Sequence, residues 1–249
     1  MQWRGMRVGA LMLFLCSTNQ PVWASPASWV ESFQNELAAL AERSHQNQDP
    51  QQGLAEARRL LQRLLHEVAG GQQACVLFAR VELLRAIFEA KLQRWEDAAW
   101  DYAVALNLDP EVARFSFSEY PDLAAIFLAE RDRWRSAFEQ RRKRQGERKE
   151  PPKLSTACAA PKRLTDKSPV YPKGARKDRR ETSVHLEVVI GKDGAPLDPL
   201  WESNCDLAPF FVAAAEAVRF WRWEPLPCEG ADGPEELLNS ITVNFALHP

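Results

Sequence analysis

The sequence predicts an α+β fold, with an all-α N-terminal domain of helical hairpins and a small C-terminal domain of order strand, strand, helix, strand. Two changes along the chain predict this division. Apolar residues recur at helical spacing between residues 27 and 148, whereas beyond residue 169 they alternate with polar residues. The stretch 149–167 is rich in Pro, Lys and small residues, which is typical of an extended linker. We therefore expect one domain at 25–148 and a second at 168–249.

Residues 1–24 have the layout of a secretory signal peptide. Arg4 and Arg7 precede the apolar run 8–16, and Ala24 stands at a small-residue cleavage site. The apolar run is nine residues long, whereas a membrane span needs ~18 or more. The sequence thus predicts an exported, periplasmic protein. The alternative is a segment that stays uncleaved and anchors the chain in the inner membrane.

Helical periodicity in the first domain is divided by turn signals into five predicted helices. Gly70 with Gly71 ends the second helix, and Asp109 with Pro110 ends the fourth. The expected ranges are 28–42, 53–69, 74–91, 95–108 and a long helix from Pro121. The apolar face of this last helix holds Leu123, Phe127, Trp134 and Phe138.

The segment 81–110 resembles a tetratricopeptide unit. In its second helix the expected intervals are filled by Trp95, Ala98, Tyr102, Ala105 and Pro110. In its first helix an aromatic residue, Phe88, stands one place out of register. A small helical bundle without repeat ancestry is the alternative. Either would serve as a scaffold or binding surface, and neither suggests chemistry.

Charge is distributed unevenly along a chain whose formal net charge is only −2. Residues 131–180 carry 18 Lys/Arg and 6 Asp/Glu, a net charge of +12. The flanking regions 25–130 and 181–249 carry net charges of −7 and −9. The basic region is either a solvated linker or a contact with an acidic partner, such as the cell wall, lipid headgroups or an acidic protein surface.

Four cysteines follow the predicted signal peptide: Cys75, Cys158, Cys205 and Cys228. An even number in an exported protein favours disulfides over metal binding, and no two of them form a C-x-x-C pair. Four cysteines allow three pairings. We prefer Cys205 with Cys228, because both lie in the same domain.

The C-terminal domain begins with a half-buried strand and a hairpin. Four apolar residues alternate with polar ones over 183–190, so that Val184, Leu186, Val188 and Ile190 share one face while His185 and Glu187 share the other. The turn 191–194 leads into a second strand at 195–203. Pro196 and Pro199 predict that this second strand is bent or lies at an edge.

A helix and a closing strand complete the domain. The helix is expected at 205–221, with Asp206 as its N-cap and a buried face of Phe210, Ala214 and Val218. The last strand covers 240–248. Its inward residues are Ile241, Val243, Phe245 and Leu247, and its outward residues are Thr242, Asn244 and Ala246.

This ordered set of features resembles the C-terminal domain of the TonB family over about residues 168–248. The matching positions are Tyr171, Pro172, Ala175, Glu181, Val184, Asp193, Gly194, Asp206, Ala214, Ala215, Trp221, Trp223, Pro225 and Phe245. The chain departs from the family at Arg179 and Thr182, where glycines are usual, and in a longer acidic segment at 226–240.

The resemblance implies a binding protein whose sheet edge takes up a peptide strand from a partner, such as an outer-membrane transporter. On this basis the expected partner-binding residues are Tyr171, Pro172, Ser240, Thr242, Asn244 and Ala246. The alternative is an energy transducer that couples an inner-membrane proton-motive complex to outer-membrane transport through an uncleaved anchor. A homodimer is also compatible with the sequence.

Chemistry is not expected. None of the four histidines stands at metal-ligand spacing with Cys, Asp or Glu, and no phosphate-binding loop or nucleophile elbow occurs. We therefore predict no enzyme activity, no catalytic residue, no metal and no cofactor. Because the protein is expected to be exported, nucleic acid is not an expected partner.

Overall fold

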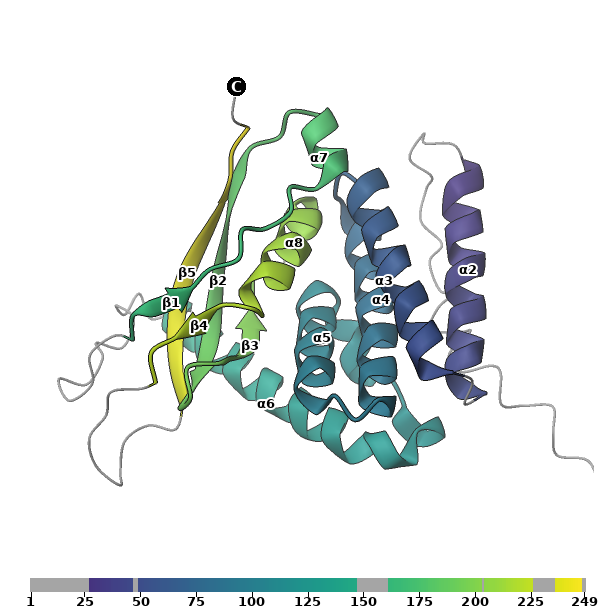
Figure 1. Cartoon of the computed structure of the whole chain (residues 1–249), viewed down its shortest axis with the longest axis horizontal. Helices are drawn as coiled ribbons and strands as arrows, with labels where there is room; N and C mark the ends of the chain where they lie inside the picture. Colours follow the sequence, from purple (N-terminus) through teal and green to yellow (C-terminus); the bar gives the residue numbers. More distant parts are fainter. Residues whose placement is uncertain (1–26, 47–48, 147–160, 203, 226–235, 248–249) are drawn as a thin grey trace, which may run out of the picture.

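The computed structural model describes residues 27–46, 49–146, 161–202, 204–225 and 236–247 (Figure 1). The predicted signal peptide, most of the predicted linker, and the residues Cys158 and Cys228 lie outside the described residues.

The N-terminal half is helical, as the periodicity predicts. Its helices are α2 (Ala27–His45), α3 (Pro50–Glu67), α4 (Gln72–Lys91), α5 (Trp95–Leu108) and α6 (Pro121–Gly146), with the short 3₁₀ turns η1 (Pro110–Arg114) and η2 (Phe117–Glu119) between the last two. Local chemistry explains why α3 begins where it does. The Asp49 carboxylate accepts a hydrogen bond of 2.9 Å from the backbone N–H of Gln51, and Pro50 occupies the first turn of α3. We call residues 27–146 the helical module.

A continuous apolar core fills the helical module. The rings of Tyr102, Phe117 and Phe127 pack against one another with centroids 4.7–5.7 Å apart. On α6 the predicted apolar face is confirmed: Leu123, Phe127 and Trp134 are buried, and Phe138 stacks on Trp134 at its margin. The tetratricopeptide resemblance of 81–110 stays a prediction.

The C-terminal half has the predicted order strand, strand, helix, strand. These elements are β2 (Thr182–Gly191), β3 (Pro196–Leu200), α8 (Ala208–Val218) and β5 (Glu236–Phe245). The sheet is antiparallel with the order β3-β2-β5. The predicted alternation in β2 is confirmed, because Val184, Leu186, Val188 and Ile190 are buried. We call residues 161–247 the sheet module.

Several small elements were not predicted. They are β1 (Arg163–Thr165), which pairs with β4 (Arg222–Trp223), the helix α7 (Lys173–Lys177) and the 3₁₀ turn η3 (Cys205–Leu207). Composition predicts a linker at 149–167, but residues 163–165 within it form a paired strand. The closing strand begins at Glu236, four residues earlier than predicted.

The β2–β3 hairpin turns at Gly194, which has a φ of +82°. A Cβ at this position would lie 2.1 Å from the backbone oxygen of Trp223, so glycine is required for both conformation and space. This contact brings β4 against the hairpin, where the Trp223 N–H donates to the Gly194 carbonyl at 3.0 Å.

The helix α8 lies between the sheet and the helical module (Figure 1). Its predicted buried face is correct, but Phe211, Val212 and Ala215 on other faces are buried as well, as expected for a helix that is apolar all round. The prediction of Asp206 as N-cap is wrong. The side chain of Asn204 accepts the Asp206 N–H at 3.1 Å and caps η3, which precedes α8.

No helix within the described residues is both long enough and apolar enough to cross a bilayer.

Candidate protein-interaction site

The sheet has two outer strands, β3 and β5, and they differ in what covers them. Strand β5 pairs with β2 along its whole length, from Glu236 opposite Gly191 to Phe245 opposite Thr182. Within the described residues, no strand pairs with the other edge of β5. An unpaired edge presents main-chain N–H and C=O groups that a further strand can satisfy.

The β3 edge is covered by α5. Asn107 of α5 donates from Nδ2 to the Pro199 carbonyl at 2.8 Å, and its Oδ1 accepts the Trp201 N–H at 2.8 Å. These two main-chain groups therefore point away from β2. Because backbone groups alternate in direction along a strand, Asp198 and Leu200 direct theirs toward β2.

The same alternation identifies the open groups on β5. Asp198 and Leu200 lie opposite Val189 and Glu187, which therefore face β3. The intervening β2 residues must then face β5, where they lie opposite Asn239, Ile241, Val243 and Phe245. The other β5 residues direct their N–H and C=O groups to the open edge; they are Glu236, Leu238 and, toward the C-terminal end, the three residues Ser240, Thr242 and Asn244.

The side chains of these three residues are exposed on the outer face of the sheet. Thr242 Oγ1 lies 2.9 Å from Nδ1 of His185, and the Ser183 hydroxyl donates to Oδ1 of Asn244 at 2.7 Å. The side chains of β5 from 240 to 244 on the outer face are thus uncharged hydrogen-bonding groups beside an open backbone edge, and Glu187 of β2 lies opposite Ser240. The sequence-predicted residues Ser240, Thr242 and Asn244 are brought together here, and Ala246 follows β5 with an exposed side chain.

Tyr171 and Pro172 lie elsewhere and serve the packing of the domain. The Tyr171 ring packs edge-on against Phe210 and Phe245, and its hydroxyl donates to the Arg180 carbonyl. Pro172 is buried and precedes α7. Burial raises the pKa of Tyr171, so its hydroxyl remains a neutral donor. Their part in partner binding stays a prediction.

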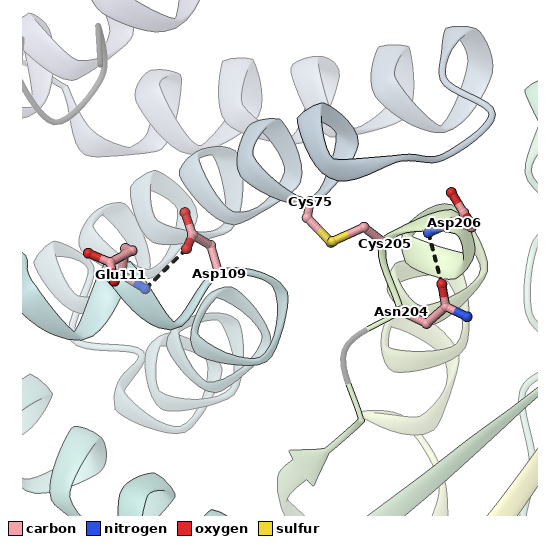
Figure 2. The surroundings of a disulfide bond; sticks show 6 residues. All are labelled: Cys75, Asp109, Glu111, Asn204, Cys205 and Asp206. Atoms are coloured by element: carbon pink, nitrogen blue, oxygen red, sulfur yellow. Dashed lines mark hydrogen bonds between the residues drawn. A yellow bond between two sulfur atoms is a disulfide. The ribbon is translucent and has the colours of Figure 1, made fainter. Parts of the chain in front are cut away.

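The predicted pairing of Cys205 with Cys228 is wrong. A disulfide joins Cys75 near the start of α4 to Cys205 in η3, across 130 residues of sequence (Figure 2). The prediction failed because it assumed that the partner lies in the same domain. The packing of η3 on α4 brings the two chain segments together, and the Gly71 N–H also donates to the Cys205 carbonyl at 2.9 Å.

A buried ionic network is a second contact that joins the two modules. Arg85 of α4 has a side chain only 2% exposed, and its Nη1 lies 2.9 Å from a carboxylate oxygen of Glu82 and 2.9 Å from one of Glu216 on α8. Asp101 of α5 lies 3.3 Å from Arg85 and 2.9 Å from Arg219, the residue that follows α8. The three carboxylates converge, and the two guanidinium groups supply the positive charge among them.

Burial governs the protonation of this network. It raises the pKa of Glu82 well above its ordinary value and raises that of Asp101 to about 6, although Arg85 opposes both effects. Burial also acts to raise the pKa of Glu216, but Arg85 and Arg219 hold it below its ordinary value. Burial in the network therefore favours the protonated form of Glu82 more strongly than solvent would.

Sequence reasoning missed Asn107 and this network. A signal was present, because charged residues occur in α4 on faces that the apolar pattern had already filled: Arg80, Glu82, Arg85 and Glu89 are all buried. Such residues indicate buried pairing. The pattern could not name their partners on α5 and α8.

Part of the basic region 131–180 is also structural. Arg133 of α6 lies 2.9 Å from Asp198 of β3, and Arg180 donates to the carbonyls of Ala69 and Asp206. These residues therefore contribute to the contact between modules.

Residues 167–247 match the family described as Gram-negative bacterial TonB protein C-terminal. The sheet module is a TonB C-terminal domain. The match does not extend to the helical module, and no curated protein and no solved structure shows significant similarity to the chain. The TonB family acts in envelope transport and protein interaction and is not a family of enzymes.

Proposed function

We propose that this chain is a periplasmic protein-interaction module whose TonB domain binds an extended peptide by adding it as a strand to β5. The observation that carries the proposal is the open edge of β5, with the main-chain groups of Ser240, Thr242 and Asn244 directed outward. The partner class that the family suggests is the periplasmic end of an outer-membrane transporter.

The residues at the open edge of β5 favour recognition of a peptide through its main chain, with little selection for the side chains of that peptide. The side chains of Ser240, Thr242 and Asn244 are uncharged and polar, so a strand added beside these residues gains backbone hydrogen bonds without covering a charged β5 side chain. The domain provides a rigid template, because β2 and β5 are paired over ten residues and the inner face of β5 packs on Phe210 and Tyr171.

The test is a titration of the chain from Ser25 onward with synthetic peptides from the periplasmic ends of outer-membrane transporters, followed by amide NMR. We expect the amides of residues 240–245 to shift and to become protected from exchange. The decisive variant is Thr242→Pro, which removes one outward N–H and leaves the β2 ladder intact. It should weaken binding by roughly ten-fold or more, the loss that corresponds to one hydrogen bond with a partner left unsatisfied.

The matched control is Thr242→Ala, which removes the contact with His185 but keeps the main-chain N–H. It should bind within about two-fold of the natural chain, since a solvated side-chain contact contributes little. Equal binding by the proline variant and the natural chain would refute strand addition at this edge.

A further inference from the structure

The β3 edge is the second place at which this sheet could accept a strand, and its closure depends on one side chain. Asn107 is 2% exposed. Its Nδ2 donates to the Pro199 carbonyl at 2.8 Å and to the Ala103 carbonyl of its own helix at 2.7 Å, while Oδ1 accepts the Trp201 N–H at 2.8 Å. Both N–H donors and the acceptor of this amide are therefore engaged.

The side-chain amide of Asn107 thus replaces the peptide group of a neighbouring strand. It donates to one residue and accepts from the residue two places further on, which are the groups that an added strand would use. The bond to Ala103 ties the same amide to α5. As long as α5 stays in place, these groups of β3 cannot pair with another chain.

Other features of β3 also disfavour its pairing with a further strand. Pro196 and Pro199 have no N–H and make the strand a poor template. The Asp198 carboxylate, with a side chain 7% exposed, is held by Arg133 of α6 at 2.9 Å. Two helices of the helical module therefore contact β3.

The helical module is also fixed to the sheet module at a second place, through residues on either side of α8. The disulfide joins Cys75 to Cys205 in η3, and Arg219, which follows α8, pairs with Asp97 and Asp101 of α5. Since α5 contributes both to this network and to the β3 edge, it is held at two points along its length.

We propose that the helical module is a fixed cap that closes the β3 edge through Asn107 and confines strand pairing to β5, so that each chain takes up one strand. The part that concerns β5 rests on the proposed function. The closure of β3 has its own test, which needs no peptide.

The test compares the full chain from Ser25 with its Asn107→Leu variant, alone and combined with Cys75→Ser and Cys205→Ser, which release the covalent link. The first measurement is hydrogen exchange of the Leu197 and Trp201 amides. The second is sedimentation velocity at rising protein concentration, with cross-links mapped by mass spectrometry. Asn107→Ser provides a smaller substitution in case the leucine prevents folding, and Asn35→Leu on the exposed surface of α2 is the matched control.

We expect the Trp201 amide to exchange roughly ten-fold faster in the Asn107 variants. With the covalent link also removed, we expect dimers whose cross-links map to 196–201, while the natural chain and the Asn35 variant show none. Unchanged exchange at Trp201 would mean that Asn107 does not close this edge. Faster exchange without any new pairing at 196–201 would mean that the cap does not restrict strand addition, and either result overturns the proposal.

Failure of the proposed function would give a different experimental result from failure of the β3 proposal. In that case transporter peptides would leave the amides of 240–245 unshifted, while the exchange and association of the Asn107 variants would still report on β3.

Discussion

Replacement of Arg85 by methionine tests the inference that the ionic network joins the modules. Methionine keeps much of the volume and removes the charge. The Arg85 side chain is 2% exposed and has three carboxylate partners, at 2.9 Å for Glu82, 3.3 Å for Asp101 and 2.9 Å for Glu216. Removing one partner from a buried ionic group costs about 3–5 kcal/mol, because the remaining charges lie unpaired in a medium of low polarity.

The structure places the expected loss near the lower end of that range. Arg219 still pairs with Asp101 at 2.9 Å and with Glu216 at 3.3 Å after the substitution. Glu82 loses its guanidinium partner, but burial already raises its pKa, so the protonated form that needs no cationic partner is favoured in the folded protein. We therefore expect the free energy of unfolding to fall by about 3 kcal/mol at pH 8.

The loss in the free energy of unfolding should increase with pH. Without Arg85 the pKa values of the three carboxyls rise further in the folded state than in the unfolded state. Groups with a raised folded pKa bind more protons when folded, so their contribution to stability decreases as pH rises. The destabilisation measured at pH 8 should accordingly exceed that at pH 5.

Urea denaturation followed by far-UV circular dichroism at both pH values provides the assay. The control is Arg114→Met, because the Arg114 side chain is 77% exposed and pairs with an exposed Glu111; its effect should stay within about 0.5 kcal/mol. A loss for Arg85→Met no larger than the control, or one that is greater at pH 5 than at pH 8, would refute the described network.

Three further outcomes follow from the structure. Glu82→Gln mimics the protonated carboxyl, so it should stabilise the protein increasingly as pH rises above about 4.5 and have no effect below, as measured by urea denaturation across pH. The double substitution Cys75→Ser and Cys205→Ser opens a link across 130 residues and should lower the free energy of unfolding by about 2–5 kcal/mol; addition of a reductant should reproduce this loss in the natural chain and leave the double variant unchanged. Gly194→Ala combines a φ of +82° with a backbone oxygen 2.1 Å from the new Cβ, and thermal unfolding should reveal a loss of more than about 1 kcal/mol; a neutral effect would contradict the described hairpin.

Local pattern was sufficient for the elements themselves. The bounds of α5 agree with the prediction, because a period of 3.6 and the Asp109–Pro110 stop are both encoded within a few residues. The strand β2 and its hairpin were predicted for the same reason. The β5 residues Ser240, Thr242 and Asn244 were proposed from the family resemblance, and the direction of their main-chain groups toward the open edge could be assigned only after the register with β2 was known.

The tertiary structure alone decided how the two modules meet. The contacts that join them connect residues far apart in sequence: 92 residues separate Asn107 from Pro199, 130 separate Cys75 from Cys205, and 131 separate Arg85 from Glu216. Periodicity reports which face of an element is apolar, but it carries no information on which distant element covers that face. The sequence by itself thus determined the helices, the strands and the TonB-type order. Which edge of the sheet is closed and which stays open depends on the packing of α5 and α8 between the modules.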